Sequence, residues 1–162
     1  MLTHVIFNSK NLISGNTQSA SYMVDWNAIL KPNTQYLCHF TYIGGANVYT
    51  GTKLACVYVD FNSQNIYQNL SSANGASTSQ MIGFLKPIVL VGSSNTCYLQ
   101  SETITNEEFL LTNRPSNGMV NIRILDNSGL PFLDNAGTPA VPSDYVLTLH
   151  FREIVNQKLE KS

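Results

Sequence analysis

The chain has 162 residues, a hydrophobic content of 43% and a net charge of −1 from nine Lys or Arg and ten Asp or Glu residues. The charged fraction of 12% is about half of the usual ~25%, and Asn, Gln, Ser and Thr take the place of the missing charges. The length predicts one domain over residues 1–162, while the scattered basic residues and short apolar runs exclude a phosphate-binding track for nucleic acid and a transmembrane helix.

The first half of the chain is predicted to form four short strands. Residues 1–8 lack the basic and long apolar regions of a signal peptide, so we expect a first strand or an N-terminal arm there. Asn8–Ser19 is polar and reads as a loop, and Gly44 with Gly45 is expected to end the third strand. The strands after the first are expected at Ser21–Trp26, Tyr36–Ile43 and Lys53–Phe61.

The second half begins with a long polar excursion, Asn62–Gln80, which contains the turn dipeptide Asn74-Gly75. Pro87 favours an edge or bulged position in the strand that follows, because proline cannot donate to a sheet ladder. Residues 153–162 read as a polar C-terminal tail. The strands of this half are expected at Met81–Val91, Thr96–Thr105, Phe109–Leu111, Val120–Leu125 and Tyr145–Phe151.

These strands predict an all-β fold with two antiparallel sheets and about eight strands. In the last strand, Tyr145, Leu147, Leu149 and Phe151 alternate with polar residues, so one face is buried and the other is wet. A sandwich, a jelly roll and a closed barrel are the available architectures. An immunoglobulin domain is disfavoured because Trp26 precedes every cysteine, and the long loops favour a single jelly roll.

The sequence contains no recognisable catalytic motif. We therefore expect that the protein is not an enzyme, and we assign no catalytic, cofactor-binding or metal-binding residue. His4, His39 and His150 are isolated in the sequence, and no His-x-His pair occurs. We expect His39 and His150 on solvated or half-buried strand faces. Neighbouring Cys38 and His39 make a poor nucleophile and base, because adjacent side chains on a strand point to opposite faces.

The remaining reactive side chains also have simpler interpretations. Glu102, Glu107 and Glu108 form the one local acidic cluster, which we interpret as a solvated turn rather than a glycosidase pair. The odd number and wide spacing of the cysteines oppose a disulfide framework and indicate synthesis in a cell interior. We therefore interpret the cysteines as small buried apolar residues. The cysteines are Cys38, Cys56 and Cys97.

Aromatic residues could build a carbohydrate-stacking platform, but packing in strands explains most of them. Tyr49 and Tyr67 lie in or near loops and are the better candidates for recognition. The other aromatic residues weighed for such a platform are Tyr22, Trp26, Tyr36, Tyr42, Tyr58 and Tyr98.

The closing third of the chain carries a familiar pattern. Asn121–Asp126 is a strand, the Asp-x-x-Gly turn leads into Asn127–Phe132, and Asp144–Phe151 contains a Tyr-x-Leu-x-Leu-x-Phe strand. With this hairpin the chain resembles the single jelly-roll capsid proteins of large double-stranded DNA viruses, especially their penton or minor capsid proteins. The specific similarity covers about a quarter of the chain, and the rest agrees in strand count and order.

The resemblance implies a structural protein of the virion capsid, made in the host cell cytoplasm. It implies a homopentamer that closes the icosahedral vertices, contacts neighbouring major and minor capsid proteins, and needs no cofactor. Both terminal segments, residues 1–8 and 155–162, would serve as arms that reach adjacent capsomers. A minor capsid protein that cements the facets and a carbohydrate-binding β-sandwich module, such as a fibre head or lectin-like domain, remain the alternatives.

Overall fold

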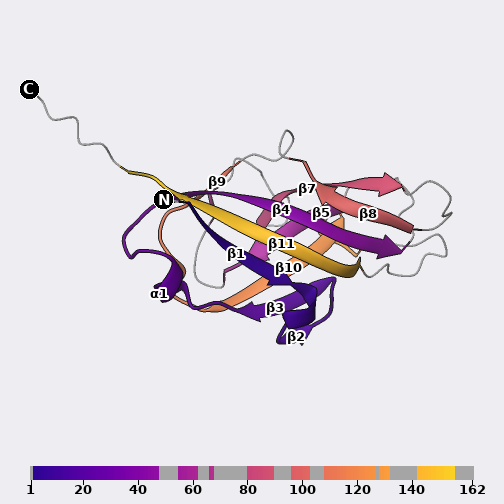
Figure 1. The fold of residues 1–162 in the computed structure, drawn as a ribbon, viewed down its shortest axis with the longest axis horizontal. Helices are drawn as coiled ribbons and strands as arrows, with labels where there is room; N and C mark the ends of the chain where they lie inside the picture. The colour runs from indigo at the N-terminus through magenta and orange to yellow at the C-terminus, as the bar shows by residue number, and fades with distance from the viewer. Residues whose placement is uncertain are drawn as a thin grey trace, which may run out of the picture.

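A computed structural model describes residues 2–47, 55–61, 66–67, 80–89, 96–102, 108–126, 128–131 and 142–155. Its regular elements are nearly all strands, with one short α-helix and one 3₁₀ turn (Figure 1). The elements are β1 (Leu2–Asn8), η1 (Ser9–Asn11), β2 (Ser14–Gly15), β3 (Ser19–Met23), α1 (Trp26–Ile29), β4 (Tyr36–Asn47), β5 (Ala55–Asp60), β6 (Ile66–Tyr67), β7 (Gln80–Val89), β8 (Thr96–Ser101), β9 (Phe109–Leu111), β10 (Met119–Asp126) and β11 (Pro142–Glu153).

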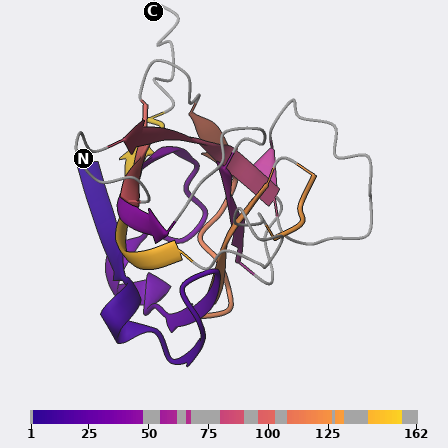
Figure 2. The same ribbon diagram turned by 90° about the vertical axis from the view of Figure 1, so that its right-hand side faces the viewer.

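The strands form one continuous antiparallel sheet of eleven strands. Its order is β1-β11-β4-β8-β7-β5-β10-β3-β2, and β9 pairs with β4 and with β6. Figure 2 shows that the sheet is not flat, because the ribbon curls around a common centre. The all-β prediction is therefore confirmed, but the described strands form one curled sheet where two separate sheets were predicted, and the β7–β8 pair is part of its continuous path.

Side-chain alternation explains why these segments form strands. Along β10, every second residue from Val120 to Asp126 is buried. The same pattern in β11 buries Tyr145, Leu147, Leu149 and Phe151, as the sequence predicts. Since strand side chains point to opposite faces with period two, each of these strands turns one apolar face into the curl and one face outward.

The core fills the inside of the curl. Trp26 packs edge-on against Phe61 and Phe151, with ring centroids 5.6 and 5.8 Å away. Aromatic pairs prefer such edge-to-face arrangements. The side chains with less than 2% exposure include Phe61, Phe109, Phe151, Ile82, Leu85, Leu99, Leu111, Ile122, Ile124, Leu147 and Leu149.

Aromatic contacts join the two ends of the curl across the core. The ring of Phe7 on β1 lies 5.1 Å from that of Tyr22 on β3. The Tyr22 hydroxyl is hydrogen-bonded to the hydroxyl of Tyr145 on β11 over 2.8 Å. Strands that stand far apart in the sheet order therefore face each other through buried side chains.

The turn after β10 forms as the sequence predicts. The buried Asp126 carboxylate accepts hydrogen bonds from the N–H groups of Ser128 (2.8 Å) and Leu130 (2.9 Å). The N–H of Gly129 donates to the Asp126 carbonyl, and Gly129 has a φ of 77°. Glycine adopts this left-handed conformation without steric cost. Asn127 lies outside the described residues.

Several predicted boundaries are wrong. The predicted strand Ser21–Trp26 ends at Met23, and Trp26 starts α1 instead. Gly44 with Gly45 does not end a strand, because β4 runs through both residues to Asn47. The predicted loop Asn8–Ser19 contains the end of β1, the η1 turn and the short strand β2.

Pro87 pairs with Leu99 of β8, and β7 lies between β8 and β5 in the sheet order, so the predicted edge position is not found. The residues that directly precede Ala55 on the β5 side lie outside the described residues. The β5–β7 register also shifts between Val57 and Tyr58, which leaves Ile82 as an extra residue on β7. Most of the predicted excursion Asn62–Gln80 lies outside the described residues.

Candidate interaction surface

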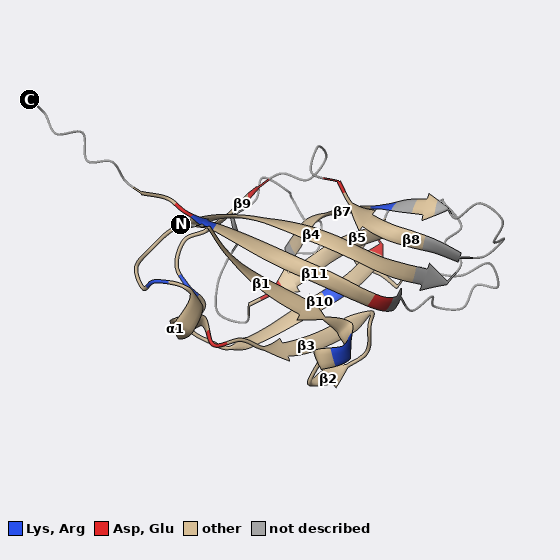
Figure 3. Ribbon diagram, in the orientation of Figure 1, with Lys and Arg blue, Asp and Glu red and all other residues tan. Residues whose placement is uncertain are grey.

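The outward face of strands β1, β11, β4 and β8 carries few charges. Strands β1, β4 and β8 contain no Asp, Glu, Lys or Arg, and Figure 3 shows the charges of β11 near its two ends. These charges are Asp144 at one end, and Arg152 and Glu153 at the other. Asp144 is paired with Lys10 over 2.8 Å and Arg152 with Glu108 over 3.1 Å.

Large apolar side chains replace charges on this face. In the strand register, Ile6 of β1 lies beside Thr148 of β11, and Val146 of β11 lies beside Ile43 of β4. Such a neutral, partly apolar surface is typical of a contact region, because it costs little to remove from water. The exposed apolar side chains of β1, β11 and β4 on this face are Leu2 (61%), Ile6 (61%), Val146 (37%) and Ile43 (55%).

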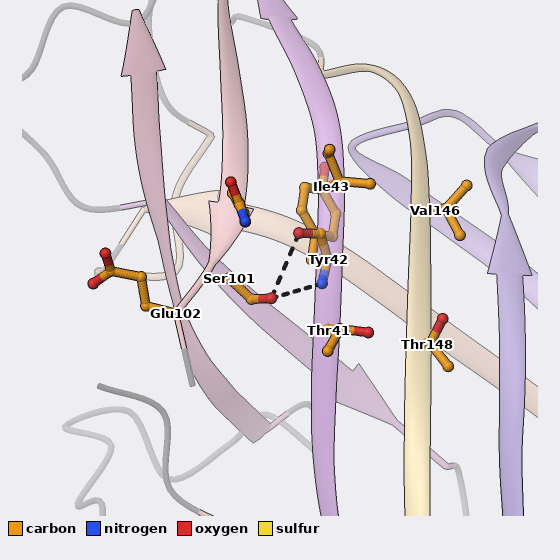
Figure 4. Close-up of a pocket in the computed structure, with 8 residues that line it drawn as sticks. Thr41, Tyr42, Ile43, Ser101, Glu102, Val146 and Thr148 are labelled. Carbon is orange, nitrogen blue, oxygen red and sulfur yellow. Dashed lines mark hydrogen bonds between the residues drawn. The ribbon is translucent and has the colours of Figure 1, made fainter. Parts of the chain in front are cut away.

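An open groove of about 550 Å³ lies on the same face (Figure 4). Ser101 closes one side: its hydroxyl accepts the N–H of Tyr42 over 2.8 Å and is 3.5 Å from the Tyr42 carbonyl oxygen. Glu102, at the rim, is bonded to Lys86 over 2.8 Å. The groove is lined by Thr41, Tyr42, Ile43, Gln100, Ser101, Glu102, Val146 and Thr148.

Three histidines lie in one row next to the groove. The register pairs His4 of β1 with His150 of β11, and His150 with His39 of β4. The His39 and His150 rings are stacked, with centroids 4.5 Å apart and an interplanar angle of 6°, and the His4 ring lies 6.1 Å from His150. His150 Nε2 is also 3.1 Å from the Thr41 hydroxyl. Residues isolated in the sequence thus form a cluster, which we call the histidine row.

The histidine row has a polar, outward setting. His39 and His150 are half-buried, as expected, and His4 is exposed. Burial lowers the pKa of His150 from its usual value, and nearby His39 and His4 lower it further because they disfavour a second positive charge. No three or more His, Cys, Asp or Glu side chains in the described part of the chain, the histidine row included, are grouped so that they could hold a metal ion.

The two cysteines whose side chains the structure describes, Cys38 and Cys56, are buried away from this face. Cys38 is fully buried and points opposite to His39, as predicted. Burial raises the pKa of the Cys38 thiol well above its usual value and that of Cys56 to about 12. Thiols this hard to ionise are poor nucleophiles. The side chain of Cys97 lies outside what the structure describes.

The acidic cluster does not form a pair of facing carboxylates among the described residues. Glu102 is bonded to Lys86, and Glu108 is bonded to Arg152. Glu107 lies outside the described residues. The described members are thus neutralised by basic partners at the surface.

The aromatic candidates divide by burial. Of the residues weighed for stacking, Tyr22, Trp26, Tyr36 and Tyr42 are buried in the core. Tyr98, on the outward face of β8, is 43% exposed. The two preferred candidates are not tested, because Tyr49 and the Tyr67 side chain lie outside the described residues. Tyr98 could have been identified from the sequence, because it neighbours Leu99 on a strand and an apolar residue that points inward places its neighbour on the outward face.

In the described ranges, no helix combines the length and the apolar character needed to cross a membrane. No family model, curated protein or solved structure matches the chain.

Proposed function

We propose that this chain is a single jelly-roll structural protein of a viral capsid, which assembles as a pentamer at the icosahedral vertices. The observation that supports it most is the nesting of the strands. A jelly roll results when a long hairpin of eight strands is rolled up, so that strand one pairs with eight, two with seven, three with six and four with five. Viral capsid domains, lectin domains and cupins use this fold.

The eight longest strands follow this nesting. In chain order they are β1, β3, β4, β5, β7, β8, β10 and β11. The nested partners are all paired: β1 with β11, β3 with β10, β4 with β8, and β5 with β7. The short strands β2, β6 and β9 are then additions to a common plan.

The outward face supports assembly. Ring-shaped oligomers need two different complementary surfaces on each subunit, and many weak contacts let errors be corrected. Ile6, Ile43 and Val146 provide apolar anchors on a face where charge repulsion is small. Neighbouring major and minor capsid proteins would contact the remaining edges of the ring.

The mass of the protein in solution tests this proposal. Sedimentation velocity is expected to give a species with five times the 17.9 kDa chain mass. Ile43→Asp and Val146→Asp place a charge among the apolar anchors and are expected to shift the protein to smaller species. Met23→Asp, at an exposed position of β3, is the matched control and is expected to leave the mass unchanged. A wild-type protein that stays monomeric at all concentrations contradicts the proposal.

The groove favours a second candidate, a carbohydrate-binding module. Thr41, Thr148 and Gln100 supply hydroxyl and amide groups at a concave surface, and Tyr98 is exposed on the same face of β8. Glycan-array binding by the monomer, abolished by Gln100→Ala and Tyr98→Ala, would support this candidate over the capsid proposal.

A further inference from the structure

The histidine row lies where β1 depends on β11. β1 stands at the end of the sheet order, and its seven residues pair with β11 from Leu2 opposite Arg152 to Asn8 opposite Val146. Its inward side chains add one fully buried residue, Phe7, to the core, while Val5 is only partly buried. β11 and β4 each have neighbours on both sides. β1 is thus a long strand that is attached to the described sheet along one side only.

We propose that the histidine row is an acid-sensitive latch, which holds β1 on the sheet at neutral pH and releases it on acidification. His4 projects from the middle of β1 and is the partner of His150 in the strand register, so the row loses this member when β1 leaves β11. Departure of β1 separates His4 from His150 and exposes the His150 ring to water. The inference concerns one chain and does not depend on the proposed function.

The direction of the effect follows from the burial of His150. Its pKa is lowered in the folded protein, first by burial and then by His39 and His4, whereas an exposed histidine has a pKa of about 6.5. The open state, in which β1 has left β11, therefore binds more protons than the closed state, in which β1 is paired. The closed state therefore loses stability relative to the open state as the pH falls below about 6.5. The Thr41 contact does not oppose protonation, because a hydroxyl can donate to neutral Nε2 or accept from protonated Nε2.

The charged groups around the histidine row are held in ion pairs, so we attribute the change of charge between pH 7.5 and 5 to the histidines. Arg152 faces the same way, two residues along β11, and its guanidinium is paired with Glu108. Beyond the other end of β1, Lys10 is bonded to Asp144 and lowers the pKa of that carboxyl. Asp144 therefore stays ionised between pH 7.5 and 5, so the pair beyond β1 persists while the histidine row gains charge.

Hydrogen exchange on the full chain tests the latch. At pH 7.5 and 5.0, with rates corrected for intrinsic exchange, the protection of the β1 amides is expected to fall about tenfold or more. The protection of β10, at the opposite side of the curl, is expected to stay constant. The loss is expected at every protein concentration, because the opening occurs within one chain.

Variants separate the histidine row from other acid effects. His150→Phe keeps a stacked ring but cannot be protonated, so the tenfold change is expected to shrink to less than twofold. His150→Gln, which also cannot be protonated at this position, serves the same purpose if His150→Phe does not fold. Thr41→Val, which removes the contact to His150 without removing a titratable group, is the control and is expected to keep the full pH response.

Three results would overturn the proposal. The first is unchanged β1 protection while the histidine ring signals titrate in nuclear magnetic resonance spectra. The second is an equal loss of protection in β1 and β10, which indicates general acid unfolding. The third is a response of the same size in His150→Phe and wild type, or one that depends on protein concentration.

Discussion

The hydroxyl pair of Tyr22 and Tyr145 is a sensitive test of how the curled sheet closes. The two oxygens are 2.8 Å apart, and both side chains are less than 5% exposed. Replacing either tyrosine by phenylalanine removes one oxygen and leaves the other hydroxyl buried without this partner. Such an unpaired group costs about 1–3 kcal/mol, so each single variant is expected to lose that much free energy of unfolding.

The double variant is expected to be far less destabilised than the sum of the two single variants. Tyr22→Phe with Tyr145→Phe removes both oxygens, which is nearly neutral when the shapes of the side chains are kept. The coupling energy, which is the difference between the loss of the double variant and the sum of the two single losses, is therefore expected to be about 2–3 kcal/mol. Tyr42 is a matched control, because its buried hydroxyl has no hydrogen-bond partner among the described residues. Tyr42→Phe is expected to be neutral or stabilising.

Urea unfolding of the four proteins of this cycle, followed by tryptophan fluorescence, measures the coupling. Trp26 is buried in the core, so its emission should report global unfolding. Additive losses from the two single variants would refute the contact between β3 and β11, as would a Tyr42→Phe variant that loses as much stability as Tyr145→Phe.

Three other perturbations give defined outcomes. Asp126→Ala removes the acceptor for two N–H groups and is expected to lose about 3 kcal/mol in urea unfolding, whereas Asp126→Asn should lose less. Gly44→Ala is expected to lose about 1–3 kcal/mol by the same measurement, because the new Cβ would lie 2.6 Å from the Cβ of Tyr145. Burial raises the pKa of Tyr22 and Tyr145 above the usual value of about 10. The stability that these neutral phenols contribute is present below pH 10 and lost above it, and absorbance at 295 nm during alkaline titration should show their delayed ionisation.

Side-chain alternation was sufficient to predict the faces of the longest strands. In β11, the four apolar residues from Tyr145 to Phe151 are buried as the period-two pattern requires. Local turn chemistry was equally informative at Asp126 and Gly129, where an acceptor side chain and a positive φ are properties of the residues themselves.

Long-range packing explains where prediction failed. Gly44 suggested a turn, but in the structure it makes room for Tyr145 of a distant strand, and only contact with that strand gives this information. Tryptophan is a residue type that is enriched in strands, yet Trp26 begins the four-residue helix α1. The indole ring of Trp26 packs on Phe61 and Phe151. Tertiary contacts override local preference in both cases.

The candidate surface was predictable in part. The alternation of side chains along each strand predicts that His39 and His150 point outward. Prediction of the histidine row also requires knowledge that β1 pairs with β11 and that β11 pairs with β4. Period-two reasoning fixes a face and contains no information on register between strands. The groove is a consequence of the same register, since its lining comes from β4, β8 and β11.

The position of β11 has a consequence for biosynthesis. β11 lies between β1 and β4, so the first and fourth strands of the described chain cannot form these pairings until the last described strand has been synthesised. Pairings this distant in sequence form slowly, because a long stretch of polypeptide must be ordered first. A nascent chain would expose the edges of β1 and β4 until translation has passed residue 153, and during that interval molecular chaperones would protect it from aggregation.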